Sequence, residues 1–209
     1  MNKSNLDIMK VKDIIQNSFF LRLPGAKNIL NLGAADGNFY EKYPWTNYNL
    51  TNLDNNSEGN VFENDCVKKY SNKKYPNIKN IVGNCNNMPM FNKDEFDMVI
   101  FTHLIEHLKP DEIKKTLSEI QRVLKKNGIL IVSTPNYKIR KFLCMNKANE
   151  FHIKEFTYQE LKKILEEKYS ILNEFGALHI NVETFMMQTL KTDDPENSYV
   201  MWMICRNKG

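Results

Sequence analysis

Short apolar runs alternate with amphipathic stretches along most of the 209-residue chain. The runs have the length of strands inside a parallel sheet, and the stretches between them have the period of crossover helices. This alternation predicts an α/β fold with a mostly parallel sheet and disfavours a helical bundle or a β-sandwich. The predicted strands are residues 27–33, 48–54, 77–83, 95–102 and 128–134.

Helical periodicity is clearest between the last two of these strands. The apolar residues that recur there at helical spacing are Ile113, Leu117, Ile120 and Leu124. The pair Asn127-Gly128 is expected to end this helix. A second helix is predicted to begin at Thr157, which can form a capping box with Glu160.

The two ends of the chain complete the predicted fold. Residues 169–180 and 199–207 predict a closing pair of strands. Near the N-terminus, helical spacing predicts a helix within residues 1–22 that packs on the core through Ile8, Val11, Ile15 and Phe19. The length is that of one ordinary globular domain, so we expect a single domain over residues 1–209.

Charge and cysteine content narrow the possible functions. The net charge is +4, but 29 basic residues are interspersed with 25 acidic ones and form no basic block, which disfavours nucleic acid as a partner. The cysteines show no CxxC or metal-ligand spacing, so we expect neither a disulfide framework nor a metal site; they are Cys66, Cys85, Cys144 and Cys205. No run approaches the ~18 apolar residues of a membrane span, and the start lacks a signal-peptide core. These features predict a cytoplasmic protein with reduced thiols and no membrane partner.

A cluster of small residues ends the first predicted strand, in ILNLGAADGNF (29–39). Gly33 and Gly37 allow a tight turn and a close approach of a ligand to the backbone. Ligands of open parallel sheets bind at this place, outside the carboxyl ends of the strands. Asp54 ends the second strand and is placed to accept hydrogen bonds from ribose hydroxyls. GAADG does not match G-x-G-x-x-G, so a nucleoside without phosphates fits better than a dinucleotide; a turn without a ligand is the alternative.

Four segments, in order, resemble a known family. ILNLGAADGNF resembles the glycine-rich first motif of class I S-adenosylmethionine-dependent methyltransferases of the small, single-domain type, and YNLTNLD (48–54) resembles their second motif. GNCNNMPMFNKDEFDMVIFTHLIEHL (83–108) resembles the adenine-contacting turn and fourth strand, and EIQRVLKKNGILIVSTPN (119–136) the helix and fifth strand. The resemblance implies a Rossmann-like doubly wound sheet of seven strands, mostly parallel, with an antiparallel hairpin at its edge.

The resemblance also implies S-adenosylmethionine as the cofactor and a set of residues that bind it. The methionine and ribose portion would be wrapped by Gly33, Ala34, Ala35 and Gly37, and the ribose would be held by Asp54. The adenine would face Asn84 and Cys85, and the transferring methyl would lie by Thr102 and His103.

Three of the cofactor-binding positions depart from the family pattern. Asn31 and Asn84 stand where the family usually has acids, and Ala35 stands where it usually has glycine.

The methyl group on a sulfonium is already activated. For methyl transfer the protein therefore has only to align the acceptor with the methyl and to remove the acceptor's proton. His103 and His152 are the candidate catalytic bases. His107, in THLIEHL, is expected instead to fix the loop after the fourth strand.

We therefore expect O- or N-methylation of a small-molecule acceptor that is sugar-like or anionic. Residues 135–156 are expected to form one wall of its pocket, because this segment leaves the ligand side of the sheet and is rich in Lys and Arg. Two alternatives stay open: a non-catalytic S-adenosylmethionine-binding regulator or partner subunit, and an RNA or protein methyltransferase. The acceptor and the oligomeric state do not follow from the sequence.

Overall fold

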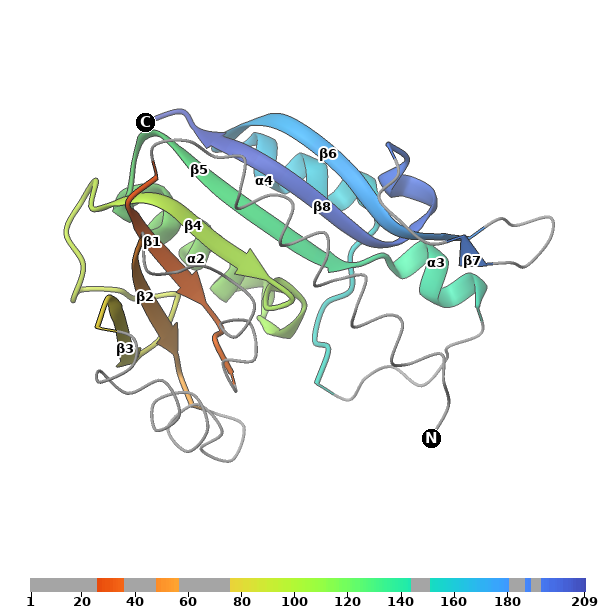
Figure 1. The fold of residues 1–209 in the computed structure, drawn as a ribbon. Coiled ribbons are helices and arrows are strands. Elements are labelled where there is room, and N and C mark those ends of the chain that lie inside the picture. Colours follow the sequence, from red (N-terminus) through yellow and green to blue (C-terminus); the bar gives the residue numbers. More distant parts are fainter. Residues whose placement is uncertain (1–25, 36–47, 57–75, 144–150, 181–186, 189–192) are drawn as a thin grey trace.

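One mixed β-sheet organises the computed structural model, which describes residues 26–35, 48–56, 76–143, 151–180, 187–188 and 193–209 (Figure 1). Within these residues the strand order is β3-β2-β1-β4-β5-β8-β6-β7. The strands that pair in parallel are β1 (Asn28–Leu32), β2 (Asn49–Asp54), β3 (Ile78–Val82), β4 (Phe96–Thr102) and β5 (Leu124–Pro135). The antiparallel part consists of β6 (Tyr169–Ile180), β7 (Met187–Gln188) and β8 (Ser198–Asn207).

The predicted Rossmann-like sheet with an antiparallel edge is confirmed. The seven expected strands all form, and the two-residue strand β7, which no periodicity marks, pairs with the end of β6. The helix predicted within residues 1–22 lies outside the described part of the chain.

Helices cover the sheet between and after the strands. They are α2 (Pro110–Val123), α3 (Tyr137–Phe142) and α4 (Tyr158–Glu166), with the short 3-10 helices η4 (Ile105–His107) and η5 (Pro195–Asn197). α4 begins as predicted, because the Thr157 hydroxyl accepts from the backbone N–H of Glu160 and the Glu160 carboxylate accepts from that of Thr157. α3 was not predicted from the sequence.

The end of α2 differs from the prediction. The helix ends at Val123 rather than at Asn127, because Leu124 pairs with Phe96 as the first residue of β5. The side-chain amide of Asn207 donates to the carbonyls of Gln121, Leu124 and Lys125, which satisfies backbone acceptors that the helix end leaves open.

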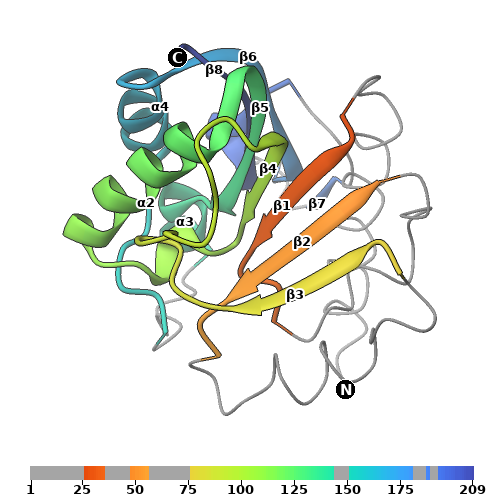
Figure 2. The same cartoon turned by 90° about the vertical axis from the view of Figure 1, so that its left-hand side faces the viewer.

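The main apolar core lies between the sheet and two of its helices. Figure 2 shows α2 and α4 on one face of the sheet. Ile120 of α2 and Leu161 of α4 are fully buried there with Leu30 of β1 and Phe101 of β4. This packing fixes the parallel strands in register, so that β1, β2, β3, β4 and β5 all end at the same edge of the sheet. No helix among the described residues is long and apolar enough to cross a membrane.

Candidate active site

Asp54 connects the loops that leave the first three strands. Its Oδ2 accepts a hydrogen bond from the backbone N–H of Ala35 at 2.9 Å, and its Oδ1 accepts one from Asn56 at 2.8 Å. Its carbonyl accepts the N–H of Gly83 at 2.9 Å, at the end of β3. The acid predicted to hold a ribose therefore lies where these three loops meet.

A small cavity of about 40 Å³ opens at this junction. Its lining comes from the ends of the first four strands and consists of Gly33, Leu53, Asp54, Asn55, Gly83, Cys85, Leu104 and Leu108. Gly33 has φ of 71°, and a Cβ at this position would lie 3.0 Å from Cδ2 of Leu104. Glycine is therefore required at Gly33 both by its left-handed backbone and by the leucine that faces it.

Two further residues of the predicted glycine-rich loop have distinct environments. Ala34 is buried, whereas Ala35 is exposed and has φ of 44°, in the left-handed region that alanine rarely adopts. Gly37 lies outside the described residues.

Asn31 lies in a row of asparagines across the sheet and not in the cavity lining. Its side-chain amide donates to Asn52 at 3.4 Å, and the amide of Asn52 donates to Asn80 at 2.7 Å. The three residues pair in register on β1, β2 and β3. Asn31 would therefore affect a bound ligand only indirectly, by positioning the ends of the strands that carry the cavity residues.

Asn84 and Cys85 follow β3 and differ in exposure. Asn84 is exposed, whereas Cys85 is half-buried, lines the cavity and has its Sγ 3.6 Å from Oγ1 of Thr116. Burial raises the pKa of the Cys85 thiol, so it stays protonated at neutral pH. An uncharged side chain of this kind suits the contact with an adenine ring.

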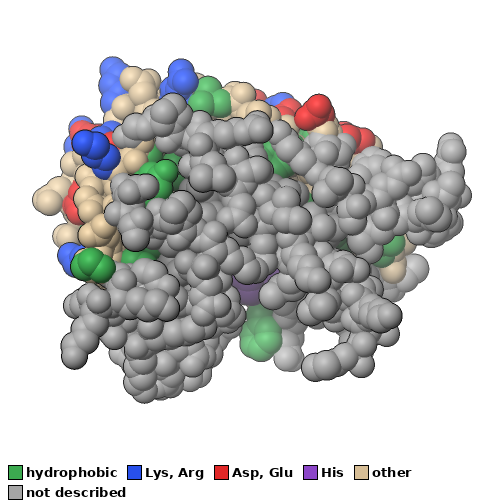
Figure 3. Space-filling view, in the orientation of Figure 1, with side chains coloured by type: hydrophobic (Ala, Val, Ile, Leu, Met, Phe, Trp, Pro, Cys, Tyr) green, Lys and Arg blue, Asp and Glu red, His purple; other side chains and the backbone are tan. Residues whose placement is uncertain are grey.

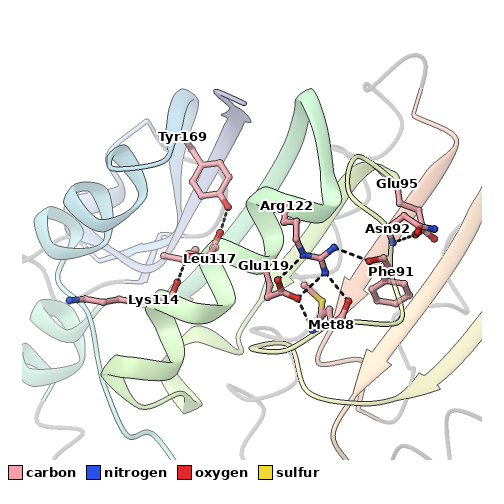
Figure 4. Close-up of polar contacts among 10 residues, drawn as sticks. Met88, Phe91, Asn92, Glu95, Lys114, Leu117, Glu119, Arg122 and Tyr169 are labelled. Atoms are coloured by element: carbon pink, nitrogen blue, oxygen red, sulfur yellow. Dashed lines mark hydrogen bonds and ion pairs between the residues drawn. The ribbon is translucent and has the colours of Figure 1, made fainter.

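Arg122 of α2 binds the chain a few residues after Asn84 and Cys85, at Met88 and Phe91 (Figure 4). Its guanidinium donates to the carbonyls of Met88 and Phe91, both at 2.8 Å. It also pairs with Glu119 at 2.7 Å, and the carboxylate of Glu119 accepts the backbone N–H of Met88. The clamp joins α2 to the loop between β3 and β4 through charge-assisted hydrogen bonds.

His103 leaves β4 in a left-handed backbone conformation. Its φ is 52°, and its N–H donates to the carbonyl of Ser133 at 2.8 Å. Its Nδ1 lies 3.5 Å from Oε1 of Glu106. Thr102, the preceding residue, is half-buried and pairs with Ser133 on β5.

Glu106 is almost wholly buried, at 1% exposure. Burial alone would raise its pKa, but the hydrogen bond and charge of His103 outweigh this and hold the pKa of Glu106 below its usual range. The Thr134 hydroxyl donates to its Oε2 at 3.0 Å. A buried carboxylate that is ionised beside His103 keeps the imidazole oriented.

The second candidate base, His152, lies in a separate polar group close to Glu106. Its Nδ1 is 3.1 Å from Oε1 of Glu155 and 2.9 Å from Nη1 of Arg140. Arg140 and Glu155 form an ion pair at 2.9 Å, so the charge of Arg140 is engaged inside the protein. The His152 ring meets that of His107 edge to face, with centroids 5.0 Å apart.

Sequence reasoning did not single out Glu106 or Glu155 as site residues, and it took Arg140 only as one of the basic residues of the expected pocket wall, residues 135–156. Glu106 stands three residues after His103 in the sequence. In a helical turn this spacing brings two side chains together, so it could have indicated the pair. Arg140 and Glu155 are 15 positions apart, and no local pattern joins them.

Comparisons with known proteins agree with this geometry. A family model described as a methyltransferase domain matches residues 30–132. No protein of curated function matches the sequence.

Solved structures resemble the whole fold at low sequence identity. An S-adenosylmethionine-dependent methyltransferase from Archaeoglobus fulgidus is 15% identical, with a TM-score of 0.71 and coverage of 99% of this chain and 100% of that one. The N-methyltransferase NodS from Bradyrhizobium japonicum WM9 is 13% identical, with a TM-score of 0.65 and full coverage of both chains. A Burkholderia thailandensis 1,6-didemethyltoxoflavin-N1-methyltransferase, with its substrate and S-adenosylhomocysteine bound, is 14% identical with a TM-score of 0.63, covering 97% and 79%.

Proposed function

The chain belongs to the class I S-adenosylmethionine-dependent methyltransferases, and from this premise we propose that it methylates an oxygen or nitrogen atom of a small molecule. The observation that carries the choice of acceptor atom is the pair His103–Glu106 at the carboxyl end of β4. Methylation of a hydroxyl or an ammonium group requires loss of a proton, and an oriented imidazole is suited to take it.

The residues around the cavity fit the cofactor. Each carboxylate oxygen of Asp54 accepts one backbone N–H and retains a further lone pair, so both can accept from ribose hydroxyls. Gly33 keeps the loop backbone bare beside the Leu104 side chain, and Cys85 with Leu108 offers an apolar wall to the adenine. Asn84 and Ala35 lie at the margin of the same site.

S-adenosylmethionine supplies a methyl group that its positive sulfur already activates. The protein holds the acceptor in line with that methyl and takes the acceptor proton on His103. Bound S-adenosylmethionine would supply the methyl carbon that the acceptor lone pair attacks, and its sulfur would take the electrons of the broken carbon–sulfur bond. Glu106 orients His103 and stabilises its charged form after proton transfer.

Residues 135–156 are proposed as the acceptor side of the pocket. The segment follows β5 at the edge where the cavity lies, and it carries His152. Three basic side chains described there are already paired, Lys138 with Glu196, Arg140 with Glu155 and Lys154 with Glu160. We therefore propose the exposed Lys141 as the contact for an anionic acceptor. Small-molecule substrates also occur among proteins of this fold, as in the toxoflavin-pathway structure.

The proposal is tested by an acceptor screen with S-adenosylmethionine that carries a labelled methyl group. Hydroxylated, amine-bearing and anionic small molecules, a total RNA preparation and a mixture of unmodified proteins are each incubated with the enzyme. Label in an oxygen- or nitrogen-methylated small molecule supports the proposal. Label confined to RNA or protein contradicts it, and cofactor binding without label in any class favours a regulatory role.

A further inference from the structure

Glu106, His107 and His152 bring one potential metal-ligand atom each to the same place. These atoms all lie within 4.8 Å of one another. The backbone holds the two contributing segments together, because the N–H groups of Ile153 and Lys154 donate to the carbonyl of Glu106 at 2.9 and 3.1 Å. The residues come from η4 and from the segment before α4, so the fold rather than a local sequence motif creates the group.

We propose that Glu106, His107 and His152 bind a divalent transition-metal ion beside the acceptor site. Two imidazoles and one carboxylate form a donor set that suits Zn²⁺ and similar ions, whereas Mg²⁺ and Ca²⁺ prefer oxygen ligands alone. The site contains no cysteine, so cysteine spacing in the sequence does not mark it.

The side chains around the three ligands are arranged as supports. The Thr134 hydroxyl donates to Oε2 of Glu106. Oε1 lies 3.5 Å from Nδ1 of His103, so the ion would share this oxygen with His103. Nδ1 of His152 lies between Oε1 of Glu155 and Nη1 of Arg140, so it can donate to the carboxylate or accept from the guanidinium. Metal binding requires the tautomer with the proton on Nδ1, which leaves the lone pair of Nε2 for coordination. Arg140, which only donates, holds the Glu155 carboxylate in this position.

The distances require a small closure on binding. Bonds of about 2 Å to the ion place neighbouring ligand atoms roughly 3 to 3.5 Å apart, somewhat closer than they lie without it. The edge-to-face rings of His107 and His152 are 5.0 Å apart at 87°, and neither ring stacks over the other. Side-chain rotation can therefore bring the nitrogens together while the backbone clamp on Glu106 stays in place.

Three protein ligands leave at least one coordination position open, as in catalytic zinc sites. His103 lies 3.5 Å from Glu106, so the ion would sit next to the proposed base. Figure 3 shows a small area of histidine surface on the face of the molecule that Figure 1 presents. On the basis of the proposed function, the open position takes an oxygen atom of the acceptor, which narrows the acceptor to molecules with such an oxygen next to the methylated atom.

Metal binding is tested first without cofactor or acceptor. The metal-free protein is titrated with Zn²⁺ by calorimetry, and with Co²⁺ while its visible absorption is recorded. We expect one ion per chain and a loss of affinity of at least tenfold in both His107→Ala and His152→Ala. Asp111→Asn removes an exposed carboxylate of α2 and is expected to bind Zn²⁺ like the wild type. The proposal would be overturned if the wild type bound no stoichiometric ion. It would also be overturned if both histidine variants bound Zn²⁺ as tightly as the wild type.

Circular dichroism shows whether the histidine variants are folded. Where one is not, Glu155→Gln provides the second test, since loss of a supporting carboxylate weakens metal affinity about 10- to 100-fold without removing a ligand. Unchanged affinity in that variant also counts against the site.

The two proposals can fail separately. Methyl transfer that persists in the presence of a chelator, with no ion bound, would leave the proposed function and remove the metal site. Zn²⁺ binding with no methylation of any small molecule would leave the metal site and remove the proposed acceptor class.

Discussion

The carboxylate of Asp54 accepts the backbone N–H of Ala35 at 2.9 Å, across the gap between the loops of β1 and β2. Ala35 keeps this hydrogen bond while its φ is 44°, in a region where an alanine costs about 1 kcal/mol more than a glycine. The acid expected to bind ribose thus also shapes the loop expected to wrap the cofactor.

Ala35→Gly should be tolerated without the usual loss of stability. Replacement of alanine by glycine typically costs about 0.5 to 1 kcal/mol, but relief of the left-handed strain offsets that cost here. Urea unfolding should give a free energy within about 0.5 kcal/mol of the wild type, and cofactor affinity should be equal or higher. Ala34→Gly, at a buried position without positive φ, is the control and should lose stability. Equal losses in the two variants would argue against strain at Ala35.

His103→Asn should separate proton removal from backbone geometry. Asparagine tolerates left-handed backbone well and has no group that titrates near neutral pH. With an identified hydroxyl or ammonium acceptor, kcat/KM should fall by about 10²- to 10⁴-fold, the usual contribution of a general base. Affinity for S-adenosylhomocysteine should change less than twofold, and undiminished turnover would exclude His103 as the base.

Arg122→Ala should weaken both the fold and cofactor binding, because it releases from α2 the residues 88–91, which closely follow Asn84 and Cys85. Loss of hydrogen bonds from a charged group predicts a decrease of about 2 kcal/mol in the free energy of unfolding. Lys115→Ala on the same helix breaks only an exposed pair and should cost less than about 0.5 kcal/mol. Denaturant unfolding and calorimetry measure the two effects, and similar results for both variants would refute the clamp.

The same clamp predicts a pH dependence. The hydrogen bond from Arg122 lowers the pKa of Glu119 from its ordinary value of 4.5, so the ionised carboxylate stabilises the fold above that value. This stability is lost as the pH falls below 4.5 and through the lowered pKa. Unfolding measured at neutral and acidic pH should therefore depend less on pH in Arg122→Ala than in the wild type. An identical dependence would show that the pair does not control Glu119.

The sequence predicted the sheet well because its strands are short and apolar and their borders are marked. The observed β6, Tyr169–Ile180, has the predicted bounds, and β1 to β4 differ from their predictions by one residue at one or both ends. The end of α2 was wrong because its termination depends on Asn207, more than 80 residues away, and on the pairing of Leu124 with Phe96. Local periodicity carries no information about such partners.

The candidate site also has a part that the sequence predicts and a part that it does not. Gly33 and Asp54 follow consecutive strands, so parallel topology alone predicts that they meet. His152 lies beside Glu106 and His107 because the segment after β5 runs back to Glu106, whose carbonyl accepts backbone N–H groups from that segment. The local sequence pattern does not predict such a tertiary contact. The basic character of residues 135–156 suggested Arg140 as an anion ligand, but the pairing of Arg140 with Glu155 is a tertiary contact.

The most direct test of the account is a calorimetric titration with S-adenosylhomocysteine of the wild type and of Asp54→Ala. The account predicts one binding site per chain, with affinity in the variant lower by roughly 1.5 to 3 kcal/mol, on the order of tenfold or more, because hydrogen bonds to a charged acceptor are lost. Circular dichroism of the variant serves as the control for folding. Absence of binding to the wild type, or equal affinity in a folded Asp54→Ala, would contradict the assignment of this edge of the sheet as the cofactor site.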